Sequence, residues 1–183
     1  FGNGKILLIA PTTGLVEQQQ RMAREMIKLD DAQISRYTGE TAPAKRPEIW
    51  NNAKIIMATS QVIRNDAQSG SIDLSEVSLL VVDEAHHATG NHAYAQVGDL
   101  YLEAKPDAMV LAATASPGSN ERNILEVAQR LGIERLDVSR REEPLLEPYS
   151  VELENIPIRV ELPDELTTLI HPLQAHQNEE VKK

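Results

Sequence analysis

The sequence predicts an α/β protein whose parallel β-sheet carries helices on both faces. Two observations support this fold class. Short apolar runs without polar alternation, typical of strands covered on both sides, alternate with longer amphipathic segments along the chain. Small polar or acidic residues follow directly where these runs end, and parallel sheets bind their ligands beyond the carboxyl ends of the strands.

Six strands and five helices are expected in alternation. The strands are placed at residues 5–10, 34–38, 55–59, 79–83, 109–114 and 133–138. The helices are placed at residues 15–29, 44–52, 60–68, 91–104 and 119–131. Alternation of this kind builds a parallel sheet through right-handed crossover connections.

Each of the first three expected strands ends in small or polar residues. The first strand, KILLIA, and the third, IIMAT, are nearly continuous apolar runs, and a helix is expected directly after each. The residues at these three strand ends are Pro11, Thr12, Thr38, Gly39, Thr59 and Ser60.

The fourth expected strand delivers two carboxylates to the sheet edge. Its apolar run Leu79–Val82 breaks into Asp83 and Glu84, which would lie at the carboxyl end of the strand. Adjacent acids repel each other unless a cation neutralises them, and Mg²⁺ shared with nucleotide phosphates is the usual solution. Alternatively, the two acids cap the next helix, whose first turn favours negative charge.

The fifth expected strand ends at the same edge in Thr114, Ala115 and Ser116, before a Pro-Gly turn. Hydroxyl groups here could hydrogen-bond to the acidic segment. Small residues are also what a tight turn prefers, so their presence alone does not decide between the two interpretations.

These elements resemble, in order, the motifs of superfamily 2 helicases. DEAH at 83–86 followed by TAS at 114–116 resembles motifs II and III, and ILLIAPTTGLVEQ at 6–18 resembles motif Ia. The threonine and glycine at 38–39 resemble motif Ib, and IIMATSQV at 55–62 resembles the next strand. The resemblance implies a RecA-like parallel sheet, part of a first motor domain, over residues 1–141. It implies an acidic extended segment and the start of a helical insertion over residues 142–183.

Within this superfamily the stretches DEAHHATGNHAYA and TASPGS are most similar to archaeal Hef-type fork helicases and their Fanconi-anaemia M relatives. RNA sensors and Dicer helicases usually carry a cysteine where Ala85 stands, which favours forked or branched DNA over double-stranded RNA as the partner. The sequence departs from the Hef-like pattern at His87, which tends to be arginine. It also departs at Thr13 and Gly14, where motif Ia often has a basic residue and proline.

The resemblance assigns roles to the residues at the sheet edge. Asp83 would hold Mg²⁺ and Glu84 would activate the water that attacks ATP, so ATP and Mg²⁺ are the implied cofactors. His86 completes the implied catalytic set, and Thr114, Ala115 and Ser116 would couple nucleotide state to the grip on nucleic acid. Contacts with the nucleic-acid backbone are implied for Pro11, Thr12, Thr38, Gly39, Thr59 and Ser60.

No phosphate-binding loop of the form G-x-x-x-x-G-K-[ST] occurs in the sequence. The segment Gly2–Lys5 lacks its spacing and its hydroxyl residue, and it precedes a strand instead of following one. Motifs IV to VI are absent as well. We therefore expect a motor fragment that hydrolyses no ATP alone and that lacks an upstream phosphate loop and a second RecA-like motor domain.

The composition is compatible with one globular domain, but it does not identify the binding partner. Of the 183 residues 41% are hydrophobic, none is cysteine, and no run reaches the length of a membrane span. We expect a cytoplasmic protein, nucleoid-associated if it is archaeal. The net charge of −10 argues against nucleic-acid binding, although several cations fall in the first third of the chain. They are Arg21, Arg24, Lys28, Lys45, Arg46 and Arg64.

Three other interpretations remain from the sequence. Glu84, His86, His87 and His92 include zinc-ligand types, but their spacing is not H-E-x-x-H. A nucleic-acid-binding or protein-binding fragment without catalytic activity would explain the missing phosphate loop. A restriction-type translocase would share the acidic pair but not the TASPGS and GNHAYA stretches.

Overall fold

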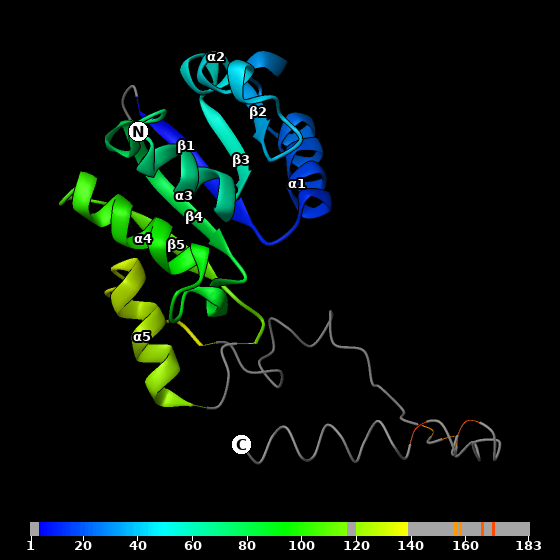
Figure 1. Ribbon diagram of the computed structural model, residues 1–183, viewed down its shortest axis with the longest axis vertical. Helices are drawn as coiled ribbons and strands as arrows, with labels where there is room; N and C mark the ends of the chain where they lie inside the picture. The colour runs from blue at the N-terminus through cyan, green and yellow to red at the C-terminus, as the bar shows by residue number, and fades with distance from the viewer. Residues whose placement is uncertain are drawn as a thin grey trace. The chain divides into compact units, whose positions relative to one another are not determined.

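The computed structural model describes residues 4–116 and 120–138, together with the single residues 156, 158, 166 and 170. A parallel sheet with the strand order β2-β3-β1-β4-β5 forms its centre (Figure 1). The predicted parallel α/β fold is therefore confirmed. The strands are β1 (Lys5–Ala10), β2 (Ile34–Tyr37), β3 (Ile55–Thr59), β4 (Val77–Asp83) and β5 (Val110–Ala113).

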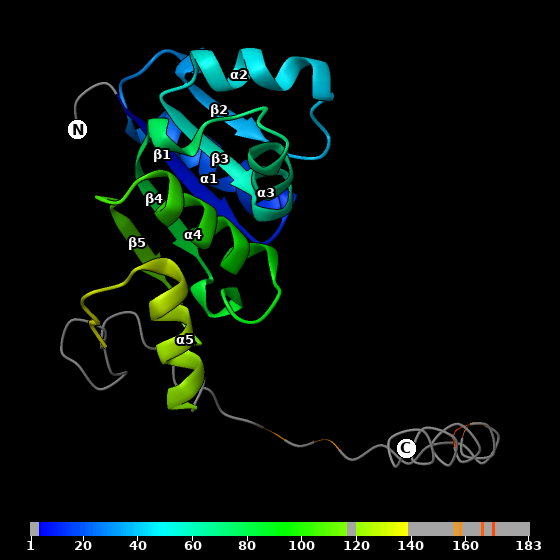
Figure 2. The ribbon, with the colours of Figure 1, turned by 60° about the vertical axis from the view of Figure 1, so that its left-hand side comes forward.

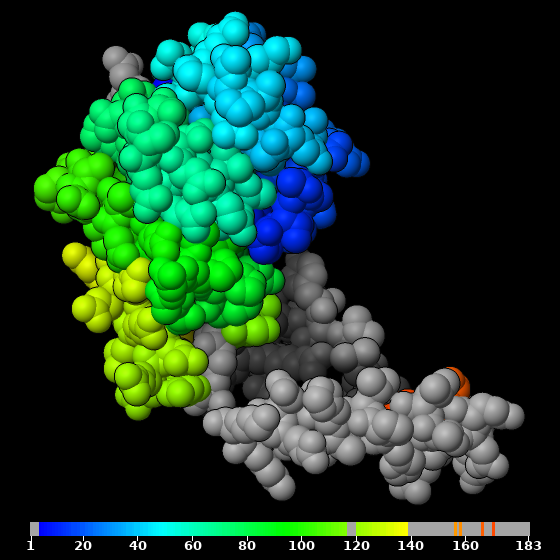
Figure 3. All heavy atoms as spheres, viewed as in Figure 1, coloured from blue at the N-terminus to red at the C-terminus, as the bar shows by residue number. Residues whose placement is uncertain are grey.

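Helices cover both faces of this sheet (Figures 1 and 2). One face carries α1, and α3 and α4 pack side by side over the other, where their side chains form a continuous surface (Figure 3). No helix in the described ranges is long and apolar enough to cross a membrane. The helices are α1 (Thr13–Met26), α2 (Arg46–Asn52), α3 (Ser60–Gln68), α4 (Ala93–Ala104) and α5 (Glu121–Leu131).

The apolar core is divided by the sheet into two layers, because successive side chains of a strand point to opposite faces. Leu7 and Ile9 of β1 belong to the larger layer, which contains residues of α3, α4 and α5. Ile6 and Leu8 pack into the smaller layer beneath α1, against Val16. This burial on both faces explains why β1 and β3 are nearly continuous apolar runs in the sequence.

The prediction of a strand at residues 133–138 is wrong. These residues have no regular structure, and among the described strands β5 pairs only with β4. A pocket of about 480 Å³ separates β5 from the segment, and Leu136 is 64% exposed. The sequence IERLDV carries apolar residues at Ile133, Leu136 and Val138, but a strand also needs a neighbouring backbone edge to pair with, and here the pocket intervenes.

Expectations for residues 142–183 fall outside the described residues, apart from the four single positions. The helices expected at 15–29, 91–104 and 119–131 are present with shifted ends. The helix α1 ends at Met26, before the sequence-based limit of residue 29, because Ile27 is already extended with φ −112° and ψ 126°.

Gly98 marks the closest approach of α4 to α5. A Cβ atom at this position would collide with the backbone carbonyl oxygen of Arg130 and with the Leu131 side chain. We expect Gly98→Ala to lower the free energy of unfolding by about 2 kcal/mol, because a backbone carbonyl cannot move aside cheaply. Chemical denaturation followed by circular dichroism measures this change.

Gly14 provides the matched control for this substitution. It lies in the first turn of α1, and a Cβ atom there would meet nothing within 4 Å. Gly14→Ala should therefore leave stability unchanged or raise it by up to about 1 kcal/mol through the loss of chain entropy in the unfolded state. Equal effects of the two substitutions would contradict the close helix crossing.

Candidate active site

Asp83 and Glu84 lie at the carboxyl end of β4, in the middle of one sheet edge. β4 pairs with β1 on one side and with β5 on the other, and Asp83 is in register with Ala113. The ends of three strands therefore meet here, and Thr114 directly follows β5. Both carboxylates are half-buried.

Both oxygen atoms of the Asp83 carboxylate accept hydrogen bonds. The backbone N–H of Glu84 donates to Oδ1 over 3.0 Å, and the side-chain amide Nε2 of Gln19 donates to Oδ2 over 2.7 Å. Gln19 belongs to α1, so this contact joins the helix to the end of β4. Sequence analysis did not identify Gln19, because a polar helix residue gives no sign of a partner that is distant in the chain.

Glu84 has a left-handed backbone conformation, with φ 52° and ψ 48°. Among the described residues it is the only non-glycine residue with positive φ. This conformation ends the strand sharply and leads into the 3-10 turn Ala85–His87. Non-glycine residues at positive φ are uncommon, and such strained positions concentrate at functional sites.

Glu84, His86 and Thr114 form a triangle of polar contacts. His86 Nδ1 lies 2.8 Å from Thr114 Oγ1 and 3.3 Å from Glu84 Oε2. The Thr114 hydroxyl lies 3.4 Å from the same Glu84 oxygen. The backbone N–H of Ser116 donates to Thr114 Oγ1 over 3.1 Å, while Ala115 and Ser116 are exposed. The acidic segment and the end of β5 are thus connected through side chains.

The remaining histidines of this region pack as aromatic rings. His87 is tilted against His86 at 4.2 Å between ring centroids and is stacked on His92 at 5.3 Å. Burial and the neighbouring charges of His86 and His92 lower the pKa of His87 below its ordinary value, which favours the neutral ring. In the described part of the chain, no three His, Cys, Asp or Glu side chains are grouped so that they could hold a metal ion.

The residues considered for nucleic-acid contacts differ in accessibility. Thr12 is exposed and its hydroxyl accepts from the N–H of Leu15, so it caps α1. Gly39 is exposed as well, and Pro11 is half-buried. The side chains of Thr38, Thr59 and Ser60 are buried. Thr59 precedes α3 without making a side-chain cap, and Gln61 is the first exposed residue of this helix.

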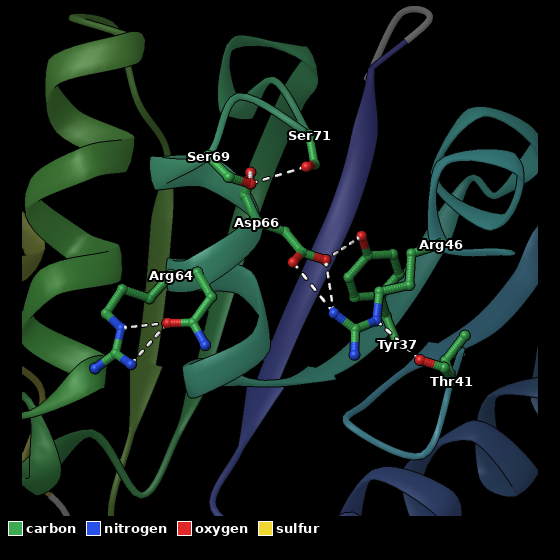
Figure 4. Close-up of polar contacts among 8 residues, drawn as sticks. Tyr37, Thr41, Arg46, Arg64, Asp66, Ser69 and Ser71 are labelled. Atoms are coloured by element: carbon green, nitrogen blue, oxygen red, sulfur yellow. Dashed lines mark hydrogen bonds and ion pairs between the residues drawn. The ribbon is translucent and has the colours of Figure 1, made fainter. Parts of the chain in front are cut away.

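A partly buried ion pair anchors the loop that contains Thr38 and Gly39. Figure 4 shows Tyr37 and Arg46 pointing toward Asp66 of α3. The Tyr37 hydroxyl donates to Asp66 Oδ2 over 2.7 Å, and Arg46 Nη1 lies 3.2 Å from Asp66 Oδ1. Arg46 Nε also donates to the carbonyl oxygen of Thr41 over 3.0 Å. Both ends of the loop are therefore tied to the helix that follows β3.

Several cations of the first third of the chain make contacts within the protein. Arg24 donates to the carbonyl oxygens of Asp31 and Ile34, each over 3.1 Å. Arg64 donates to the Asn65 side chain, over 2.7 and 3.0 Å. Carbonyl and amide oxygens are neutral, so these hydrogen bonds orient the guanidinium groups without cancelling their charge, whereas Arg46 pairs with the Asp66 carboxylate.

Comparison with known proteins identifies the family. The family model described as DEAD/DEAH box helicase matches residues 1–124. The chain belongs to this family. Its acidic segment DEAH therefore corresponds to the motif from which the family takes its name.

Individual relatives of this helicase chain come from archaea and animals. A Methanocaldococcus jannaschii protein with the provisional name ATP-dependent RNA helicase is 38% identical over 180 residues, which are 98% of this chain and 23% of that protein. The Fanconi anemia group M protein of Gallus gallus is 34% identical over 186 residues, covering 100% of this chain and 9% of the relative. The helicase chain thus spans less than a quarter of either protein.

A solved structure agrees with the fold. The crystal structure of the Pyrococcus furiosus Hef helicase domain superposes with a TM-score of 0.77 at 40% identity, covering 88% of this chain and 34% of that one. The predicted resemblance to Hef-type and Fanconi-anaemia M-type helicases is thereby confirmed.

DEAD/DEAH box helicases use ATP with Mg²⁺, and the donor set of this helicase chain fits that ion. Mg²⁺ is held by oxygen atoms, commonly by one or two carboxylates together with substrate phosphates and water. Asp83 and Glu84 supply two half-buried carboxylates, and neither forms an ion pair with a lysine or arginine among the described residues. An acidic pair without such a partner is suited to a divalent cation.

Proposed function

We propose that this chain is part of the first motor domain of an ATP-dependent helicase that moves along forked or branched DNA. The observation that carries the proposal is the triangle of Glu84, His86 and Thr114. It connects the Glu84 carboxylate, which is suited to activating water, with Thr114 at the end of β5. The residues suited to catalysis and those suited to coupling are therefore already in contact.

Asp83 would hold Mg²⁺, and Glu84 would orient the attacking water and accept its proton. When bound, Mg²⁺ supplies positive charge that neutralises the phosphate oxygens during phosphoryl transfer. The backbone of Glu84 turns its side chain away from the line of β4, so the two adjacent acids are directed differently. This separation allows one carboxylate to serve the metal and the other to serve the water.

His86 and Thr114 would transmit the state of Glu84 to the rest of the motor. A change in the hydrogen bonds of Glu84 must alter the bonds of Thr114, because the hydroxyl has one proton and two possible acceptors. Thr114 also accepts from the Ser116 N–H, so the change reaches the exposed segment after β5. In this proposal Ala115 and Ser116 face the second motor domain.

The nucleic-acid strand would lie across the ends of β1, β2 and β3. The exposed loop at Gly39 and the exposed Gln61 in the first turn of α3 offer backbone and polar side-chain contacts that need no net positive charge, consistent with the charge of −10. Pro11 and Thr12 would border the same path. Thr38, Thr59 and Ser60 are buried as whole residues, at 1%, 7% and 0% exposed, so they would support this surface from beneath instead of contacting the strand.

DNA is favoured as the substrate. Ala85 stands where RNA sensors and Dicer helicases usually have cysteine, and a relative in Neosartorya fischeri bears the name ATP-dependent DNA helicase mph1. The provisional name of the archaeal relative, an ATP-dependent RNA helicase, supports RNA as the alternative substrate.

The test is the ATPase rate of a longer polypeptide that adds a phosphate loop and a second motor domain to this chain. Forked DNA, single-stranded DNA and double-stranded RNA are added separately as activators. We expect the strongest stimulation with forked DNA and no hydrolysis by the 183-residue chain alone, because it contains no phosphate loop. Stimulation by RNA alone would move the protein to the RNA-dependent branch, and no stimulation would favour a binding fragment without catalysis.

A further inference from the structure

Gln19 is the only side chain among the described residues that donates a hydrogen bond to Asp83. Its amide Nε2 lies 2.7 Å from Asp83 Oδ2, and the contact is partly buried. Oδ1 is occupied by the Glu84 N–H. These two bonds engage different oxygen atoms and come from different directions, so together they hold the carboxylate against rotation about its side-chain bonds.

The orientation of the Gln19 amide is determined by its electrostatic interaction with the Asp83 carboxylate. If the amide were turned around, its oxygen would face the carboxylate oxygen and repel it, so the nitrogen must point to Asp83. The Oε1 atom then points away from Asp83. It is buried and has no hydrogen-bond partner in the part of the chain that the structure describes. Leaving a buried acceptor unpaired costs free energy unless a donor is supplied from elsewhere.

Gln19 is connected rigidly to the rest of the fold. α1 packs on β1, β2 and β3, and its next residue, Gln20, donates to the Ile34 carbonyl oxygen over 2.9 Å. Arg24, one turn further along, donates to the same carbonyl oxygen over 3.1 Å. The Gln19 amide therefore belongs to a helix whose position against the sheet is fixed by these contacts.

We propose that Gln19 is a positioning residue that holds the Asp83 carboxylate in the orientation required to bind Mg²⁺. The proposal rests on the proposed function, because it takes Asp83 as the metal ligand. It extends that function to α1, whose role would otherwise be limited to packing and to the nucleic-acid side of the domain. Residues that orient a metal ligand typically change metal affinity by about 10- to 100-fold when they are replaced.

The experiment uses the longer polypeptide with complete motor domains and Mn²⁺ as the probe in place of Mg²⁺. Mn²⁺ binding is measured by electron paramagnetic resonance in the presence of a nucleotide that is not hydrolysed. Gln19→Met keeps the length of the side chain and removes the donor, and Gln19→Ala serves as the second variant. We expect both to weaken Mn²⁺ binding about tenfold or more.

Steady-state ATPase assays provide the second measurement. The Mg²⁺ concentration that gives half-maximal activity should rise by a similar factor in both variants. kcat at saturating Mg²⁺ and the affinity for forked DNA should change by less than threefold, since neither depends on holding Asp83 once the metal is bound. The matched control is Gln129→Met, because Gln129 is an exposed helical glutamine that lies outside the motif segments.

The outcomes separate the two proposals. Unchanged Mn²⁺ affinity in folded Gln19 variants, with only a lower melting temperature, would assign Gln19 a purely structural role and overturn this inference alone. Absence of nucleotide-dependent Mn²⁺ binding in the unsubstituted protein would overturn the proposed function and this inference together. Weakened Mn²⁺ binding in Gln129→Met as well would show that the effect is not specific to the Asp83 contact and would also overturn it.

Discussion

Glu84→Gln is expected to lower the ATPase rate of the motor by about 10² to 10⁴-fold, the usual contribution of a positioned general base. The glutamine keeps the shape of the side chain but cannot accept a proton from the attacking water. Its amide can still bond to Thr114 and His86, so the fold of the site should be retained. Steady-state hydrolysis with forked DNA at saturating Mg²⁺ measures the loss.

The affinity for nucleotide and for forked DNA should remain within a few-fold in this variant, because Glu84 contacts neither in the proposal. Glu103→Gln is the matched control, since this glutamate is exposed on α4 and far along the chain from the sheet edge. Full activity of Glu84→Gln would remove Glu84 from the chemistry. An equal loss in Glu103→Gln would point to a general effect of charge.

Asp66→Ala is expected to lower the free energy of unfolding by about 3 kcal/mol or more. The Asp66 side chain is 13% exposed, and that of its partner Arg46 is 15% exposed. Removing the carboxylate leaves a poorly hydrated guanidinium and the hydroxyl of Tyr37, a residue that is 0% exposed, without their acceptor. Burial and the hydrogen bond to Asp66 raise the pKa of Tyr37, which keeps the phenol protonated and able to donate.

Thermal denaturation of the 183-residue chain measures this loss, and a change of this size corresponds to roughly 6 to 12 °C in melting temperature. Asp99→Ala is the matched control. Asp99 also pairs with an arginine, Arg130, at 2.6 Å, but the two side chains are 50% and 27% exposed. We expect Asp99→Ala to lower the free energy of unfolding by about 1 kcal/mol or less, because exposed ion pairs are screened by water. Equal losses in the two variants would show that burial does not determine how much these ion pairs contribute to stability.

The fold could be predicted because β1 and β3 are covered on both faces and β4 largely so. These strands therefore appear in the sequence as apolar runs followed by polar residues, and the helices fit between them. The segment 133–138 was mispredicted because apolar residues in a short segment do not record whether another strand is available to pair with the backbone.

The candidate site was predictable to the extent that it follows from strand ends. Asp83 and Thr114 end neighbouring parallel strands, so topology alone brings them to one edge. Gln19 and Asp66 were not predictable, because each reaches its partner from a helix face across a large separation in sequence. The burial of Thr38 could not be foreseen either, since it depends on how the loop to Arg46 is folded back.

The left-handed backbone at Glu84 implies a conflict between stability and activity at one position. Glycine would adopt φ 52° without steric cost, and substitution to glycine there should relieve about 1 kcal/mol of strain. It would also delete the carboxylate. A search for stabilised variants by thermal selection alone would therefore favour a glycine at the one place where it destroys the proposed chemistry, so any such selection must include ATP turnover as a second criterion.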